Sequence, residues 1–324
     1  MERPDFEYES CSVCMAEKDL QTGCLERCYA GRLPELRPPE VTPVKFHHVS
    51  VGSLCLMFAA ITFSPAPAVV AQQEAGQTGP PSKYLFVNNL ELKPNQNNAY
   101  AKLEQEEVQA MHAAKAPSHY LALWSITGHN RLLYLSGFDS FADLQKNHEV
   151  TMAMPKLMDT LRTNNAAEAP LIVSRQSSIY SYEKDLSLMH PLDLSKMRFM
   201  RIVLFHVRRS RGEDWERTVK LMVKAYQSAL PEAHWAMFQK MYGEGSGITY
   251  ILVTPMESLA TVDIMHDNGK KFRESVGEDQ LKTLQNSLTA DVESSESDLF
   301  ALGPQISYVP DSWITSSPDF WGKK

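Results

Sequence analysis

One order of predicted elements, strand-helix-strand-strand-helix-strand, occurs twice between residues 83 and 312, and this repetition limits the folds open to the chain. In the first copy, an apolar, aromatic-rich run predicts a strand, and apolar residues broadly on one side predict the helix that follows. The predicted ranges are strand 83–92, helix 95–114, hairpin strands 119–126 and 131–138, helix 141 to about 162, and strand 178–182.

The second copy follows Pro191 and has the same order. Its first helix carries Trp215, Val219 and Val223 at helical spacing, and a glycine-rich turn separates the two strands of its hairpin. The predicted ranges are strand 199–207, helix 213–230, strands 234–242 and 248–254, a helical region 259–288 broken near Gly269 or Gly277, and strand 305–309.

Short local matches also relate the two copies. The segment Pro117-Ser-His119-Tyr120 opens the second strand of the first copy, and Pro231-Glu-Ala-His234-Trp235 opens that of the second. The tetrapeptides IYSY at 179–182 and ISYV at 306–309 are assigned to the closing strands. Self-similarity at this spacing predicts a duplication within the chain.

A unit with this order predicts a four-stranded antiparallel sheet with both helices on one face. The run MRFMRIVLFHV at 197–207 is apolar on both sides, so the second face must be covered as well. Two tandem units can cover each other. The sequence therefore predicts an α+β fold of two tandem ferredoxin-like units, 83–190 and 191–312, with antiparallel sheets packed as a pseudo-symmetric α/β barrel.

In this architecture and strand order, residues 83 to 312 resemble the dimeric α/β barrel superfamily, without a signature motif. The superfamily includes small monooxygenases, NIPSNAP-like proteins, chlorite dismutase-like haem proteins and many uncharacterised proteins. The resemblance implies a cavity between the two sheets. For a chlorite dismutase-like protein it also implies a proximal histidine in the second unit, for which His206 and His266 are the candidates.

Residues 44 to 71 have the three parts of a secretory signal. A short polar start with Lys45 precedes an apolar run, which two prolines end, and small residues close at Ala71. The run is too short and too interrupted to span a membrane, so no stable insertion is expected after cleavage. We therefore expect export to the periplasm or the exterior, cleavage near Ala71 and a flexible linker over 72–82.

The residues that precede this signal have two interpretations. If Val44 is encoded by a GTG start codon, residues 1–43 are an upstream extension and not native protein. Alternatively, the segment holds a small zinc site, because its paired cysteines have the ligand type of a zinc knuckle. The ligands would be Cys11, Cys14, Cys24 and Cys28. All five cysteines, Cys55 included, precede Ala71, so the mature part needs no disulfide.

Charge and motifs exclude several functions. The formal net charge is −7 and no basic run occurs, which disfavours nucleic-acid binding. The sequence has no HExxH motif, no Gly-x-Ser-x-Gly elbow and no close cluster of histidines and carboxylates. The acidic stretch from Asp291 to Asp298 is predicted to be a solvated loop.

The candidate cavity residues are imidazoles that can ligate haem iron or transfer a proton, and aromatic side chains that can line a cofactor-free site. The alternative is that they are hydrogen-bonded boundary residues and ordinary core aromatics. They are His119, Trp124, Tyr134, His206, His234, Tyr250 and His266. The aromatic tail, residues 313–324, is expected to fold over the barrel mouth or to contact another subunit of a homo-oligomer.

The leading functional hypothesis is an exported protein that binds a small apolar ligand between the sheets, without an identified catalytic motif. The alternatives are an oxidoreductase, either haem-dependent or cofactor-free, and a structural interaction module whose barrel is filled by side chains. The resemblance to chlorite dismutase-like proteins implies haem as a cofactor, and no motif in the sequence indicates another.

Overall fold

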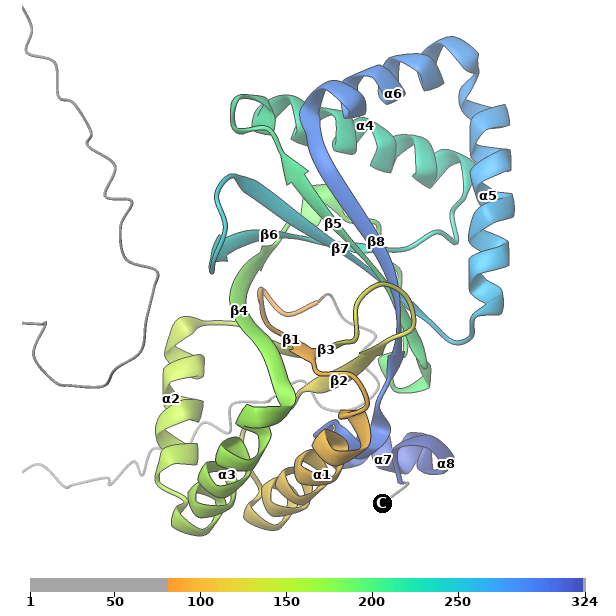
Figure 1. Ribbon diagram of the computed structural model, residues 1–324. Coiled ribbons are helices and arrows are strands. Elements are labelled where there is room, and N and C mark those ends of the chain that lie inside the picture. Colours follow the sequence, from red (N-terminus) through yellow and green to blue (C-terminus); the bar gives the residue numbers. More distant parts are fainter. Residues whose placement is uncertain (1–80, 323–324) are drawn as a thin grey trace, which may run out of the picture. The chain divides into compact units, whose positions relative to one another are not determined.

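The computed structural model describes residues 81–322, and their centre is a closed barrel of antiparallel strands in the order β1-β3-β2-β8-β5-β7-β6-β4 (Figure 1). The strand bounds are β1 Tyr84–Leu92, β2 Leu121–Ser125, β3 Arg131–Phe138, β4 Ile172–Tyr182, β5 Phe199–Val207, β6 Ala236–Tyr242, β7 Ile248–Met256 and β8 Val292–Leu302. Because every strand has two neighbours, the barrel exposes no sheet edge.

Each half of the described chain supplies one continuous set of four strands. The first half contributes β4-β1-β3-β2 and the second β6-β7-β5-β8. The two sets join at two seams, where Leu123 of β2 lies opposite Leu302 of β8, and Tyr182 of β4 lies opposite Phe238 of β6. The barrel therefore closes only when both halves are folded.

The helices form two groups outside the barrel, α1 to α3 beside the first half and α4 to α6 beside the second (Figure 1). In the first group, the Asn164 amide of α3 donates to the Leu103 carbonyl of α1 at 2.9 Å and fixes that pair. The helix bounds are α1 Asn97–Ala114, α2 Phe141–Met152, α3 Pro155–Glu168, α4 Gly212–Ala229, α5 Ala260–Val276, α6 Glu278–Asp291, α7 Asp311–Ser316 and α8 Pro318–Trp321.

Apolar side chains from both halves fill the middle of the barrel. Val87, Leu133, Ile202, Ile251 and Phe300 belong to one buried cluster there. Strand residues alternate between the two faces of a sheet, so their neighbours along each strand face the helices. The barrel body is thus a close-packed core, and free space is left towards its end.

The two closing strands are longer than the sequence predicts. Strand β4 begins at Ile172 rather than at residue 178. The closing strand of the second half is β8, Val292–Leu302, and the prediction at 305–309 is wrong. The loop predicted from Asp291 to Asp298 is also wrong, because Asp291 is fully buried against the Arg211 guanidinium at 2.8 Å and Asp298 lies within β8.

The predicted helix over 141–162 is two helices in the structure. Proline cannot donate the backbone hydrogen bond of a continuing helix, and Pro155 stands at the first position of α3. The second helical region breaks at Gly277, one of the two predicted positions, where φ is +83° and ψ 153°, a conformation open almost only to glycine.

The sequence comparison pairs the ISYV segment, residues 306–309, with IYSY at 179–182, but in the structure it corresponds to the connection that contains Leu188. The isolated bridge between Tyr120 and Tyr308 matches that between Leu188 and Trp235 in the other half. Beside the first bridge the Ser307 hydroxyl accepts from the Ala122 amide, and beside the second Ser187 accepts from Met237, both at 2.9 Å. The connections after β4 and β8 therefore make corresponding contacts in the two halves.

The predictions made for residues 1–43, for the signal at 44–71 and for most of the linker at 72–82 lie outside the described residues. Within residues 81–322, none of the helices is both long and apolar enough to cross a membrane.

Candidate functional site

One end of the barrel holds a cavity of about 530 Å³. Strands of both halves supply its inner wall, which includes Leu85, Leu135, Met200, Phe238 and Val253. Leu135 and Val253 are nearly inaccessible to solvent, and the other side chains also pack against the barrel core. This wall is continuous with the apolar core and suits an apolar occupant.

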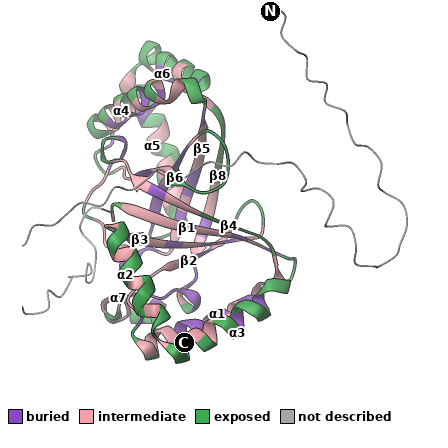
Figure 2. Cartoon of the chain, turned by 90° about the vertical axis from the view of Figure 1, so that its left-hand side faces the viewer, coloured by how far each residue is buried: buried purple, intermediate pink, exposed green. Residues whose placement is uncertain are grey.

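Helix α2 borders the cavity. It contributes Leu144, Asn147 and Val150 to the lining. None of its residues is buried, and Figure 2 shows the helix in the colours of exposed and intermediate residues. A helix with so few buried contacts belongs to the less stable parts of a fold.

The tail supplies another part of the wall. Trp313 of α7 lines the cavity and is 6% exposed. Trp321 holds the tail in place, because its indole nitrogen donates to the Ser195 carbonyl at 2.7 Å. The Arg198 guanidinium lies 4.0 Å from the centre of the Phe320 ring, a cation–π contact. The aromatic tail therefore packs on the barrel mouth within its own chain.

The polar groups of the cavity gather near its mouth. The His119 ring stacks on Tyr308 with 4.8 Å between ring centres. Burial lowers the pKa of His119, and the neighbouring His112 lowers it further, so the neutral imidazole is favoured. The Asp139 carboxylate accepts the Lys83 backbone amide at 3.1 Å. A neutral imidazole and an anchored carboxylate can orient one polar group of a mainly apolar ligand.

The aromatic residues predicted to line the barrel lie in different places. Tyr250 is fully buried on the helix side of its sheet, beside Trp215, and its hydroxyl donates to Glu216 at 3.2 Å. Trp124 packs in the cluster beneath α1. Neither residue lines the barrel-mouth cavity, because each sits at a strand position that faces outward. Tyr134 lines a second cavity.

Of the predicted histidines, His119 alone lines the barrel-mouth cavity. His234 is a boundary residue whose Nε2 lies 2.9 Å from the Pro255 carbonyl. His266 is exposed on α5, and His206 lies on β5 near its end, outside both cavities. Neither of the two histidines considered as haem ligands therefore lines one of these two cavities, and the residues that line them do not include a candidate for the expected proximal ligand in the second half.

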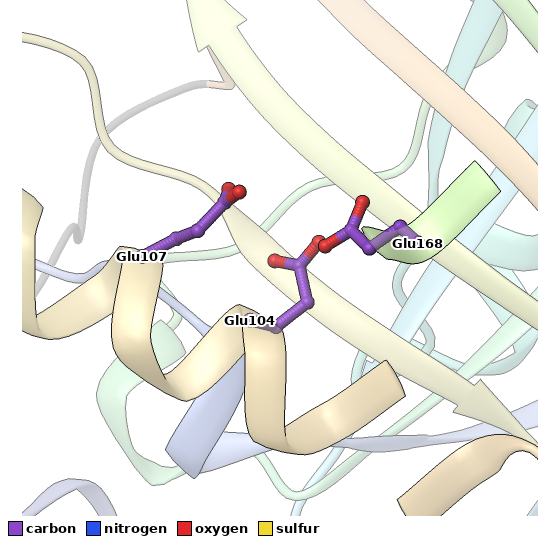
Figure 3. A group of neighbouring side chains, drawn as sticks. All are labelled: Glu104, Glu107 and Glu168. Atoms are coloured by element: carbon purple, nitrogen blue, oxygen red, sulfur yellow. The ribbon is translucent and has the colours of Figure 1, made fainter. Parts of the chain in front are cut away.

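The second cavity, of about 380 Å³, lies between α1, α3 and strands of the first half. Glu104 and Glu107 of α1 and Glu168 at the end of α3 project into it (Figure 3). One carboxylate oxygen from each lies within 4.8 Å of the other two. The sequence has no close cluster of histidines and carboxylates along the chain, and this group is instead assembled from two separate helices.

The three carboxylates are among the most deeply buried acidic groups of the described chain, at 6%, 8% and 2% exposure for Glu104, Glu107 and Glu168. Burial, with repulsion among the three, raises the pKa of Glu107 to about 9 and that of Glu168 to about 8. Burial also raises the pKa of Glu104, although Tyr100 donates to it at 2.8 Å. Such perturbation in a cavity is typical of functional sites.

A sequence signal for part of this cluster was present. Glu104 and Glu107 are three residues apart in a predicted helix and therefore share one face, and Val108 lies next to them on the apolar side. Glu168 comes from another element, 61 residues beyond Glu107, and the sequence pattern carries no sign that it joins them.

The chain matches no protein-family model and no curated protein. It resembles solved structures, among them a candidate monooxygenase from Fusobacterium nucleatum at 9% identity and TM-score 0.45, over 68% of this chain and 91% of that one. An anthrone oxidase-like protein matches at 13% identity and TM-score 0.45, over 70% and 93%. A mutant chlorite dismutase from Candidatus Nitrospira defluvii, in complex with cyanide, matches at 10% identity and TM-score 0.40, over 69% of this chain and 92% of that one. These likenesses concern the fold alone.

Proposed function

We propose that the protein binds a small apolar molecule with one polar group in the barrel-mouth cavity. The observation that carries this proposal is the cavity itself, about 530 Å³ in volume, with an apolar inner wall and a few polar groups at its mouth. Small-molecule sites in proteins commonly have this size and this distribution of polarity.

Binding in this cavity is favoured because the wall is preformed. The inner wall is formed by side chains fixed in the barrel core, so a ligand need not order them. Each apolar square ångström that the ligand removes from water contributes about 25 cal/mol. The ligand's polar group would lie near His119, at the mouth.

A second candidate is oxidation of the bound molecule without a cofactor, with dioxygen as the co-substrate that accepts the electrons. The observation that favours it is His119, whose pKa is lowered by burial and whose neutral ring lines the cavity. A neutral imidazole can accept a proton from a bound phenol or enol. Turnover would be tested only after a ligand has been identified.

We also propose that the protein is exported after cleavage near Ala71, and that the two halves of the barrel arose by duplication. The signal-like segment 44–71 supports export. The repeated element order and the paired serine contacts of Ser187 and Ser307 support duplication. Mass spectrometry of the native protein tests export: an N-terminus near Gln72 is expected, and a chain that retains residues 1–43 would contradict it.

Ligand binding can be tested with the apolar fluorophore 1-N-phenylnaphthylamine and the full chain. Ala236 lines the cavity and is 6% exposed, so Ala236→Phe fills part of the space. Ala260, exposed at the start of α5, provides the matched control Ala260→Phe. We expect saturable binding by the wild type and the control, and at least tenfold weaker binding by Ala236→Phe. Absence of saturable binding by the wild type, or equal binding by a folded Ala236→Phe variant, would refute the proposal.

A further inference from the structure

We propose that Glu104, Glu107 and Glu168 form a binding site for a divalent metal ion of the oxygen-preferring class, of about the size of Ca²⁺. The site is separate from the binding of an apolar ligand at the barrel mouth. It rests on the geometry of the cluster, on unsatisfied buried atoms, on charge and on a comparison between the two halves.

The spacing of the carboxylates fits an ion. One oxygen from each glutamate lies within 4.8 Å of the other two. Ca²⁺ binds oxygen at about 2.3–2.6 Å, so two oxygens on opposite sides of the ion are about 4.6–5.2 Å apart. The three groups can therefore contact one ion without a change of backbone, and water can complete the coordination from the cavity.

Two carboxylate oxygens at the site lack a hydrogen-bond partner. The Oε1 atoms of Glu107 and Glu168 are buried and have no hydrogen-bond partner among the described residues. The two glutamate residues are more than nine-tenths buried and line the cavity. Figure 3 shows their side chains beside that of Glu104. An unpaired buried polar group costs about 1–3 kcal/mol, and more if it is charged. A cation would satisfy both carboxylate oxygens at once.

The charge balance favours a divalent ion. Arg175 is the cation paired with the cluster, with its guanidinium 3.5 Å from Glu168 Oε2. The Tyr100 hydroxyl donates to Glu104 Oε1 at 2.8 Å and adds no charge. Carboxylates ligate a metal in their ionised form, so binding displaces the protons that the empty site holds. With all three carboxylates ionised and one guanidinium beside them, the cluster carries a net charge of about −2, which a divalent cation neutralises.

The second half of the barrel shows that the fold does not require these carboxylates. Helices α1 and α4 each have 18 residues, and the fourth residue of each is a buried aromatic, Tyr100 or Trp215. At the positions of α4 that correspond to Glu104 and Glu107 stand Val219 and Met222. The corresponding positions are therefore apolar in helix α4 and acidic in helix α1, which points to a function for the acidic residues of α1.

An ion can reach the site from solvent. Asn165, Arg175 and Ser177 line the same cavity and are exposed. They lie where the cavity opens, so entry needs no opening of the barrel. The oxygen atoms of Asn165 and Ser177 suit a hydrated cation on its way in.

The test uses Tb³⁺ as a luminescent substitute for Ca²⁺. Tyrosine near the ion transfers excitation energy to it, and Tyr100 and Tyr134 both line the cavity. With the full chain, we expect saturable, tyrosine-sensitised luminescence that added Ca²⁺ reverses. Glu104→Gln and Glu107→Gln keep the shape of each side chain and should weaken Tb³⁺ binding at least tenfold.

Glu106 provides the control, since it lies on the same helix but is exposed. Glu106→Gln removes the same charge and should leave the affinity for Tb³⁺ unchanged. Circular dichroism checks that every variant is folded. The proposal is overturned if the wild type gives no saturable luminescence, if Ca²⁺ does not displace Tb³⁺, or if the control weakens binding as much as Glu104→Gln. Because the readout is independent of the fluorophore, failure here leaves the apolar site standing, and the reverse also holds.

Discussion

Asp298 on β8 and Arg131 on β3 form an ion pair that ties the two halves of the barrel together, and removal of the carboxylate should destabilise the fold strongly. Both side chains are largely buried, at 19% exposure for Arg131 and 16% for Asp298. The guanidinium carbon also lies 5.8 Å from the Phe300 ring centre, next to the barrel core. In Asp298→Ala the guanidinium would remain in this environment without its counter-ion.

The structure sets the expected size of the effect. Removing one partner of a buried pair costs about 3–5 kcal/mol. Here Glu296 lies 4.0 Å from Arg131 and is exposed, so it can replace part of the lost attraction. The hydrogen bond from the Thr127 hydroxyl to Asp298, at 3.0 Å, is lost as well. We therefore expect Asp298→Ala to lower the free energy of unfolding by about 2–4 kcal/mol.

A double-mutant cycle with Arg131→Met measures the interaction energy of the pair, because the double variant has neither the guanidinium nor the carboxylate. Urea denaturation should give a coupling energy near 2 kcal/mol. The exposed pair of Lys270 and Asp267, 3.1 Å apart, is the control and should couple by about 0–0.5 kcal/mol. A coupling between Arg131 and Asp298 no larger than the control would refute the reasoning.

Two further predictions concern the barrel mouth. Trp321→Phe removes the hydrogen bond to Ser195 and should lower stability by about 1–2 kcal/mol in urea denaturation, whereas no change would mean that the tail contributes little. Burial is the main cause that lowers the pKa of His119; His112 lowers it further and Asp311 opposes the shift. Protonation of His119 is therefore less favourable in the folded state than in the unfolded chain. The free energy of unfolding should therefore be undiminished above the pKa of His119 in the unfolded chain, near 6.5, and should decrease as the pH falls below that value. His119→Gln should make this fall smaller, and an unchanged pH profile would contradict the assignment.

The sequence was sufficient for the element order but not for the full length of the closing strands. In β4 and β8 the first half of each strand is exposed and polar, with sequences such as SRQSS and ESSES. A strand exposed on both faces has no apolar alternation, so pattern analysis finds only its buried end. In the second half the apolar pattern instead favours a strand at 305–309, a segment that makes a turn and a single bridge in the structure.

The candidate sites were less accessible to sequence reasoning than the fold. His119 was found because its segment repeats around His234, yet only His119 lines the cavity. Similar sequence segments therefore do not imply similar environments in the two halves. Helical spacing places Glu104 on the same face as Glu107, but an acidic residue is expected to be exposed to solvent. The burial of Glu104 depends on Tyr100 and on the end of α3, which are contacts that only the folded chain supplies.

Strand β3 explains how two cavities of opposite character can lie on the two faces of one strand. Because side chains alternate along a strand, Leu135 lines the apolar cavity while Tyr134 lines the acidic one. Tyr120 and Ser136 line both, so the two spaces share a wall. In the second half, the adjacent residues of β7 are Tyr250 under α4 and Ile251 in the core, and both sides are packed. The second half thus supplies a rigid support, and the first half can carry polar groups that a small isolated domain could not stabilise.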